Sequence, residues 1–316
     1  MRILVVGAGS IGGYFGGRML AAGRDVSFLV RERRAAQLAR TGLTIRSPLG
    51  DVSAPAPTLA AAALREPFDL ILLSCKAYDL EGAMDSFAAA VGPGTLILPL
   101  LNGMRHLDAL EGRFGAQRVL GGLCVISAVL DAEGRILHLN SSHSLAFGAR
   151  GGARIEALEA AAEALSGCGF EARRSGAILQ EMWEKWVFIA SAAGITCLMR
   201  GPVGDIVAAG AADLAIALTD ECAGIAASQG FAPAEGALRK CRDLLTTPGS
   251  SFAASMLRDI ERGGRIEGEH VIGDLLRRGG AAGRPLLRIA DAHLKAYEAR
   301  RTREEAAGAR PAPPRG

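Results

Sequence analysis

The stretch Gly7-Ala8-Gly9-Ser10-Ile11-Gly12 decides the fold. It has the spacing G-x-G-x-x-G, follows the apolar run Ile3–Val6 and opens a helical pattern, Ile11–Ala22. This order of strand, glycine-rich turn and helix is typical of a dinucleotide-binding unit, whereas the glycines alone would indicate only a turn. Gly7 would permit the tight turn, Gly9 would let a pyrophosphate approach, and Gly12 would allow close helix–strand packing. We therefore expect these six residues to bind a dinucleotide at the helix N-terminus.

Short apolar runs and helix-length segments alternate through the first half of the chain. The expected strands are Ile3–Val6, Asp25–Val30, Leu70–Ser74, Thr95–Leu100, Val119–Leu130 and Arg135–Phe147. A further hairpin is expected around Leu43–Ile45, with its turn at residues 48–51. The alternation predicts an α/β fold whose N-terminal part is a doubly wound Rossmann sheet.

The chain has 316 residues, about twice the length of a typical single domain, so two domains are expected. From Ala153 to about Glu298 the pattern is almost wholly helical. We expect an NADP-binding Rossmann domain over residues 1–173 and an all-helical domain with the substrate site over residues 174–301. Residues 302–316 have nothing to bury and are predicted to be disordered.

Composition argues against several classes of partner. The formal net charge of +3 is small and dispersed, which argues against nucleic acid and anionic membranes. No apolar run reaches membrane-spanning length, and the first residues already enter a strand pattern, which leaves no room for a signal peptide. The six cysteines form no C-x-x-C pair, which favours a reducing compartment and no metal site. We expect a cytoplasmic protein.

The residue after the second expected strand bears on the choice of cofactor. Sites that prefer NAD usually place an acidic residue there, on the ribose 2′-hydroxyl. This chain has Arg31, with Arg33 and Arg34 close behind. A guanidinium suits the 2′-phosphate of NADP, although Glu32 could contact the ribose and the basic residues could simply begin a solvated helix. We expect NADP(H) as the cofactor.

Two polar residues follow expected strands of the sheet. Lys76 comes after Leu70–Ser74, and Asn102 comes after Thr95–Leu100. Ligands of open parallel sheets bind outside the carboxyl ends of the strands, so both residues are candidates for the site. A solvated loop lysine and a simple Asn-Gly turn are the alternatives.

Lys185 is the candidate acid. Ala177–Ala193 has the pattern of a helix, and Lys185 shares a face with Met182 and Ile189. An ammonium that projects from an apolar stripe is suited to proton donation. An i,i+4 ion pair with Glu181, or a lysine that reaches past apolar neighbours to water, would explain the spacing equally well.

Several spaced motifs together resemble the ketopantoate reductase (2-dehydropantoate 2-reductase) family, over nearly the whole chain to about Glu298. They are Gly7–Gly13, Ser74-Cys75-Lys76-Ala77, Leu101-Asn102-Gly103-Met104, Trp183-Glu184-Lys185, and Ser255–Ile260 with Glu267. The resemblance implies a Rossmann domain, a helical domain and NADPH. It also implies that Lys185 donates a proton to the C2 carbonyl of the substrate.

The same resemblance implies roles for four other residues. Lys76 and Asn102 would line the nicotinamide and the substrate, Ser255 would meet the substrate carboxylate, and Glu267 would hydrogen-bond cofactor or substrate. A helix-capping Ser255 and a Glu267 favoured near a helix N-terminus are the alternatives.

The chain departs from the family pattern after Lys185. The family usually has Asn residues there that contact substrate, whereas this chain has Ile189, Ala193 and Val203. A pocket without those amides should lose affinity for a substrate that relies on them. Arg200 could replace them as an anion contact, or could be a surface arginine after a helix.

These features predict an NADPH-dependent reductase of a 2-oxo acid, either ketopantoate itself or another small-molecule substrate. Lys185 would stabilise the developing oxyanion and supply the proton. The second hypothesis is a non-catalytic NADP-binding sensor on the same fold, which would have no need for an acid. The sequence leaves the substrate open, and it leaves a homodimer open.

Overall fold

A computed structural model describes residues 1–150 and 155–308. The described residues form two compact units. The first holds Met1–Leu101 and His106–Ile178, and the second holds Asn102–Arg105 and the chain from Leu179 onward. Ala153 and residues 309–316 of the expected tail lie outside the described residues.

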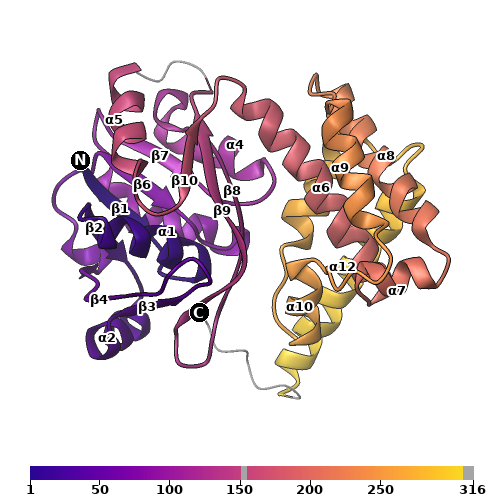
Figure 1. Ribbon diagram of the computed structural model, residues 1–316, viewed down its shortest axis with the longest axis horizontal. Coiled ribbons are helices and arrows are strands. Elements are labelled where there is room, and N and C mark those ends of the chain that lie inside the picture. Colours follow the sequence, from indigo (N-terminus) through magenta and orange to yellow (C-terminus); the bar gives the residue numbers. More distant parts are fainter. Residues whose placement is uncertain (151–154, 309–316) are drawn as a thin grey trace. The chain divides into compact units, whose positions relative to one another are not determined.

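The first unit contains a five-stranded parallel sheet with the order β5-β2-β1-β6-β7 (Figure 1). Its strands are β1 (Arg2–Val6), β2 (Asp25–Leu29), β5 (Thr58–Leu59), β6 (Leu70–Leu73) and β7 (Leu96–Pro99). The accompanying helices are α1 (Ser10–Ala21), α2 (Glu32–Thr41), α3 (Leu80–Phe87) and α4 (Arg105–Phe114). Val6 pairs with Leu29 on one side and Leu73 on the other, so three strands end together at one edge. The prediction of a Rossmann-type α/β fold is confirmed.

A second sheet in the same unit has the order β10-β9-β3-β4, with β8 also paired to β9. Its strands are β3 (Leu43–Arg46), β4 (Val52–Ala54), β8 (Gly121–Leu130), β9 (Ile136–Gly148) and β10 (Glu171–Arg174). The expected hairpin is present as the antiparallel pair β3–β4. The long strands β8 and β9 form an antiparallel ribbon (Figure 1). The sequence did not predict that these strands leave the first sheet.

Helix α1 packs against both sheets through glycines. A Cβ added to Gly16 would lie 2.6 Å from Cε1 of Phe28 in the first sheet. On the side of the second sheet, a Cβ on Gly17 would lie 2.8 Å from Cδ1 of Ile45, and one on Gly13 would lie 2.5 Å from Cδ1 of Ile136. Side chains at these positions would therefore push the helix away from the strands.

The described part of the second unit is helical. Its helices are α6 (Ile178–Met199), α7 (Val203–Ala208), α8 (Ala212–Ser228), α9 (Glu235–Leu245), α10 (Ser255–Glu261), a π-helical turn (Glu269–Gly273), α11 (Asp274–Gly279) and α12 (Pro285–Ala306). Every residue of α6 from Ala190 to Cys197 is buried, so this half of the helix belongs to the core. In the part of the chain that the structure describes, no helix has both the length and the apolar character to cross a membrane.

The expectation that residues 153–298 are almost wholly helical holds for the described residues with one exception, the strand β10. Residues 171–174 pair in parallel with Ser144–Phe147 of β9, after helix α5 (Ile155–Leu165). Glu-Ala-Arg-Arg has no strand periodicity, but a polar strand is tolerated at a sheet edge, where an open row of backbone groups recruits it. The pairing also keeps residues 171–174 in the first unit, which extends to Ile178, beyond the boundary expected near Arg173.

Helix α12 differs from the expectation at its C-terminus. It continues to Ala306, although disorder was expected from Thr302 onward. Arg301, which is buried, pairs with Glu298 three residues before it and with Glu305 four residues after it. Pairs at this spacing stabilise a helix end that has little apolar surface to bury.

Replacement of Gly16 by Ala tests the close packing of α1. Gly16→Ala should lower the free energy of unfolding by about 1–3 kcal/mol, because the new methyl group has no space beside Phe28. Gly82→Ala in α3 is the control, because Gly82 is exposed and no atom lies within 4 Å of an added Cβ. This variant should raise the free energy of unfolding by about 0.5–1 kcal/mol. Thermal and urea unfolding measure both, and equal effects would contradict the packing argument.

Candidate active site

The glycine-rich turn joins β1 to α1, and its three motif glycines differ in geometry. Gly7 has a positive φ of 93°, which favours glycine. A Cβ on Gly12 would overlap Oγ of Ser74 and the carbonyl oxygen of Gly7. A Cβ on Gly9, by contrast, would meet no atom within 4 Å, and Gly9 has no side chain to cap α1. The open side of Gly9 and the first-turn N–H groups of α1 (Ser10, Ile11) fit a dinucleotide diphosphate.

Two residues without an expected role hold this turn in place. Arg34 of α2 donates from Nε to the carbonyl oxygen of Ala8 at 3.0 Å and from Nη1 to that of Gly134 at 2.9 Å. The hydroxyl of Ser74 lies 3.1 Å from the carbonyl oxygen of Val6 and 3.2 Å from that of Gly7. Burial lowers the pKa of Arg34, while the charge of Asp131 opposes the shift. Ser74 is the first residue of the motif Ser74-Cys75-Lys76-Ala77. Nothing in the local sequence distinguishes Arg34 from Arg31 and Arg33.

Arg31 and Lys76 lie beyond the ends of β2 and β6. Arg31 precedes the first residue of α2, is largely exposed, and forms an ion pair with Asp79 at 3.1 Å. Lys76 is exposed and precedes a short helical turn, Ala77–Asp79, in which the Asp79 N–H donates to the Lys76 carbonyl oxygen. The structure therefore connects the two predicted cofactor residues through Asp79. An exposed ion pair is worth only about 0–1 kcal/mol, so a phosphate could displace Asp79 from Arg31 at little cost.

In the second unit, the two residues before Lys185 have structural partners. The ring of Trp183 stacks on that of Phe231, with centroids 5.5 Å apart. Oε1 of Glu184 accepts a hydrogen bond of 2.9 Å from the N–H of Ala234, at the start of α9. Lys185 is half-buried in the more open half of α6. Packing and helix capping thus explain Trp183 and Glu184.

Asn102 belongs to the second unit by its contacts, although it lies only three residues after the end of β7. In the next residue, Gly103, φ is 79°, and an added Cβ would lie 3.1 Å from the carbonyl oxygen of His270. Burial lowers the pKa of His270, and the carboxylates of Glu267 and Asp274 and a hydrogen bond with the Asn102 backbone only partly offset this. His270, which the sequence did not single out, is therefore neutral near pH 7 and connects the Asn102 turn with the Glu267 segment.

Glu267 is half-buried just before the π-helical turn Glu269–Gly273. π-turns are rare and occur frequently at functional sites. This one is held to α6, because Nε1 of the buried Trp186 donates to the carbonyl oxygen of Val271 at 2.8 Å. The structure thus brings the Glu267 segment beside the part of α6 that carries Lys185.

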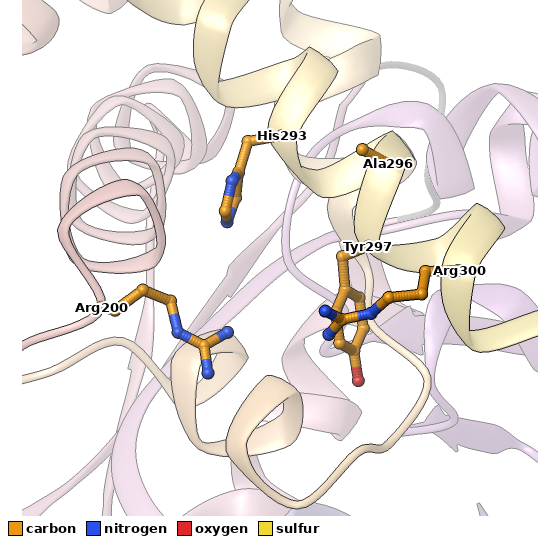
Figure 2. A pocket seen from close by; sticks show the side chains of 5 residues that line it. All are labelled: Arg200, His293, Ala296, Tyr297 and Arg300. Atoms are coloured by element: carbon orange, nitrogen blue, oxygen red, sulfur yellow. The ribbon is translucent and has the colours of Figure 1, made fainter. Parts of the chain in front are cut away.

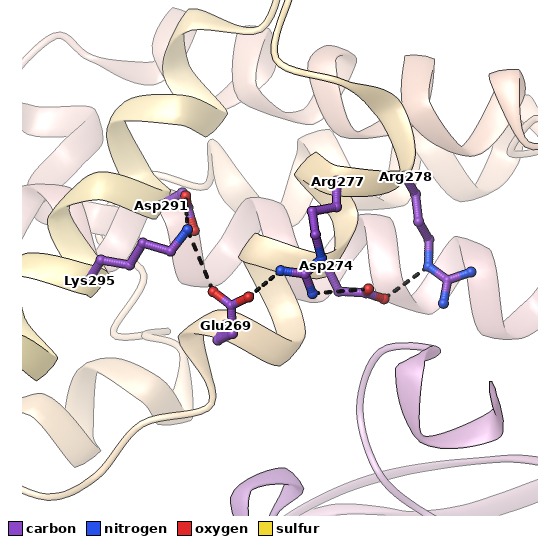
Figure 3. A network of polar contacts seen from close by, with 6 residues as sticks. All are labelled: Glu269, Asp274, Arg277, Arg278, Asp291 and Lys295. Carbon is purple, nitrogen blue, oxygen red and sulfur yellow. Dashed lines mark hydrogen bonds and ion pairs between the residues drawn. The ribbon is translucent and has the colours of Figure 1, made fainter. Parts of the chain in front are cut away.

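Charged residues fix the segment that follows Glu267 (Figure 3). Glu269 pairs with Arg277 of α11 and, at 3.6 Å, with Lys295 of α12. The buried Asp274 accepts from Arg277 at 3.2 Å and from Arg278 at 2.9 Å. Because Asp274 has two cationic partners, its burial is compensated, and the network ties the π-turn to α11 and α12.

Ser255 and Arg200 lie in different surroundings. Ser255 is exposed as the first residue of α10; Ala254 precedes the helix, so the helix-capping alternative for Ser255 is wrong. Arg200 follows α6, whose last residue lies about 21 Å along the axis from Lys185 at 1.5 Å per residue. It lines a pocket with His293, Ala296, Tyr297 and Arg300 (Figure 2). The structure therefore groups Arg200 with α12.

The three positions where the resemblance implies Asn carry apolar side chains. Ala193 is 1% exposed and Val203 is 0% exposed, so neither has room for a solvated amide. Ile189, one turn after Lys185, is half-buried. None of the three side chains can form a hydrogen bond with a substrate.

The parallel sheet with its glycine-rich turn, together with a helical second unit, defines a dinucleotide-binding oxidoreductase architecture. The family model "Ketopantoate reductase PanE/ApbA" matches residues 3–152, and its C-terminal counterpart matches residues 177–291. The chain belongs to the ketopantoate reductase family of oxidoreductases.

Relatives of known sequence or structure cover nearly the whole chain. An uncharacterized oxidoreductase, YkpB, of Bacillus subtilis is 40% identical over 95% of this chain and 99% of its own length. The structure of 2-dehydropantoate 2-reductase from Geobacter metallireducens is 28% identical, with a TM-score of 0.84 over 94% of this chain and 99% of its own. A D-mandelate dehydrogenase solved with NADH and anilino(oxo)acetate is 22% identical and shares the fold, with a TM-score of 0.86 over 96% of this chain and 100% of its own.

Gly9→Ala tests the open side of the glycine-rich turn. Gly9 has φ −80° and ψ −161°, which alanine adopts freely, and its methyl group would meet no protein atom. The variant should fold normally but bind NAD(P)H at least about tenfold more weakly, a loss of 1.4 kcal/mol or more, because the methyl group occupies the approach of the diphosphate. Fluorescence titration measures the Kd. Gly94→Ala, at an exposed glycine with equal space, is the control, and an unchanged Kd in Gly9→Ala would place the cofactor elsewhere.

Proposed function

We propose that this protein reduces the carbonyl group of a 2-oxo acid with NADPH. The observation that carries the proposal is the half-buried Lys185 on α6, in a chain that matches the family in both of its parts. Its neighbours Trp183 and Glu184 are used for packing and capping, so the motif preserves the position of one ammonium group.

In this proposal each predicted site residue has a separate task. Residues Gly7–Gly12 hold the diphosphate, Arg31 holds the 2′-phosphate, and Lys76 and Asn102 line the nicotinamide. The cofactor, when bound, supplies the hydride. Nζ of Lys185 hydrogen-bonds the carbonyl oxygen, stabilises the charge that develops there and gives up its proton to it. Ser255 meets the substrate carboxylate, and Glu267 hydrogen-bonds cofactor or substrate.

The apolar residues at these three positions bear on the substrate. Ile189 follows it by one turn, and Ala193 and Val203 are enclosed where the family has amides. A site that lacks these hydrogen-bonding groups gains nothing from a hydroxyl-bearing substrate. We infer that the preferred substrate is a 2-oxo acid with an apolar body, and that ketopantoate is a poorer one. The D-mandelate dehydrogenase with the same fold, solved with anilino(oxo)acetate, supports substrate variation on this architecture.

A panel of 2-oxo acids tests the activity. NADPH oxidation should be fastest with branched or aromatic 2-oxo acids and slower with ketopantoate. If NADPH binds but no member of the panel is reduced, the chain is instead a cofactor-binding sensor.

Lys185→Ala tests the proton donor. Loss of a positioned acid typically costs about 10²–10⁴-fold in rate, so kcat with an accepted oxo acid should fall by that factor. NADPH should still bind, since the glycine-rich turn is unchanged. Lys185→Arg should restore little activity, because guanidinium is a poor proton donor near neutral pH. Stopped-flow rates and NADPH titration separate the two effects, and a near-normal kcat in Lys185→Ala would make the lysine structural.

Arg31→Ala tests the choice of NADPH. Removal of the guanidinium should raise the KM for NADPH by about tenfold or more while that for NADH changes little, because only NADPH carries the 2′-phosphate. Arg40→Ala, at an exposed arginine in the last turn of α2, is the control. Steady-state kinetics with both cofactors measure the difference. If Arg31→Ala changes both KM values equally, Arg31 does not bind the 2′-phosphate.

A further inference from the structure

A pocket of about 440 Å³ lies where the C-terminal end of α6 meets α12. It is lined by Arg200, His293, Ala296, Tyr297 and Arg300, and all of its charged or titratable side chains except the tyrosine are bases (Figure 2). Its volume lies within the range of ordinary small-molecule sites. The α6 end that it borders is about 21 Å along the helix axis from Lys185.

Arg200 has an unusual backbone for a residue with a side chain. Its φ of 57° makes it the only residue other than glycine with a positive φ in the part of the chain that the structure describes. Glycine would adopt this conformation without strain, but the chain has its glycine at the next position, Gly201, and an arginine at the position with the positive φ. The guanidinium forms no hydrogen bond or ion pair with any other described residue. Strain at an unpaired arginine points to a function for its side chain.

His293 contributes a buried nitrogen without a partner. Its ring is hydrogen-bonded to the backbone of Cys197, whereas Nε2 is buried and has no hydrogen-bond partner among the described residues. Burial, and then the charges of Arg200 and Arg300, lower the pKa of His293. A buried nitrogen of this kind is costly unless a ligand pairs with it. A bound anion would favour protonation of Nε2, which could then donate to it, and would offset the charges of Arg200 and Arg300.

Other charged groups near the pocket leave it cationic. Arg300 lies 3.7 Å from Oε1 of Glu304, and its guanidinium is 5.9 Å from the centroid of the Tyr297 ring. The hydroxyl of Tyr297 already donates to the carbonyl oxygen of Gly264 at 2.7 Å, so the residue offers its ring. The charges of Asp259 and Glu261 help to raise the pKa of the nearby Cys197. Neither carboxylate forms an ion pair with Arg200 among the described residues.

We propose that this pocket binds the phosphate group of a small molecule, at a site separate from the reacting lysine. Arg200 and Arg300 supply charge-assisted donors, and His293 supplies a third once the bound anion favours its protonated form. Ala296 and the Tyr297 ring contact the rest of the ligand. A phosphate group offers enough oxygens for all three donors, whereas a carboxylate has only two.

Isothermal titration of the whole protein with inorganic phosphate and with phenyl phosphate, at constant ionic strength and both with and without saturating NADP⁺, tests the proposal. Both should bind, and tighter binding of phenyl phosphate would identify a phosphorylated metabolite as the ligand, whereas equal binding would identify phosphate itself. Absence of binding at millimolar concentrations, or binding that NADP⁺ abolishes, would overturn the proposal, since the second result would assign the pocket to the cofactor.

Arg200→Gly is the decisive variant, because glycine adopts the local backbone freely and only the guanidinium is lost. It should weaken phosphate binding by about tenfold or more and remove the rise in Tm that phosphate gives the wild type. Its Tm without phosphate should equal or exceed that of the wild type, which excludes unfolding as the cause. Arg288→Gln, at an exposed arginine on α12 outside the pocket, should bind as the wild type does. Equal affinity in Arg200→Gly and the wild type would refute the site.

Discussion

The first unit depends on how closely α1 approaches the strands around it. Gly12 sits where a Cβ would overlap Ser74 and the turn itself, and Gly13, Gly16 and Gly17 let the helix pack between two sheets. This approach fixes the N-terminus of α1 at the edge where β1, β2 and β6 end. Because these four glycines have no side chains, α1 can lie close to the strands. Its position and direction, and those of its dipole at the candidate cofactor site, therefore depend on the glycines.

In two motifs, a residue with a structural contact lies beside a candidate site residue. Arg34 donates hydrogen bonds to backbone carbonyl groups of the glycine-rich turn and of Gly134. Its neighbour Arg31 is exposed and pairs with a single carboxylate, that of Asp79. In the same way Trp183 and Glu184 fasten α6 to the α9 region, and Lys185 remains half-buried. A rigid support beside an accessible charge is what catalysis by positioning requires, because the reacting group must not move when water is excluded.

The second unit shows the same division on a larger scale. Buried ion pairs at Asp274 and the bond from Trp186 to Val271 hold the π-turn after Glu267, and neutral His270 connects this segment with the Asn102 turn. At the other end of α6, the Arg200 guanidinium and Nε2 of His293 have no hydrogen-bond partner among the described residues. A buried nitrogen without a partner, beside an exposed arginine with a positive φ, is the feature from which a ligand is inferred.

The sequence alone determined the elements whose signal is local. Spacing and composition predicted the order of strand, glycine turn and helix, the hairpin β3–β4 and the helical second half. Spacing and family resemblance together indicated the candidate residues Lys76, Asn102, Lys185, Ser255 and Glu267. Only the tertiary structure decided that β8 and β9 form a second sheet, that Glu171–Arg174 joins its edge, that Arg34 supports the turn, and that Arg200 belongs with α12. Periodicity reports which face of an element is apolar, but it carries no information on which distant backbone or side chain will satisfy a polar group. Those pairings are set when the chain packs.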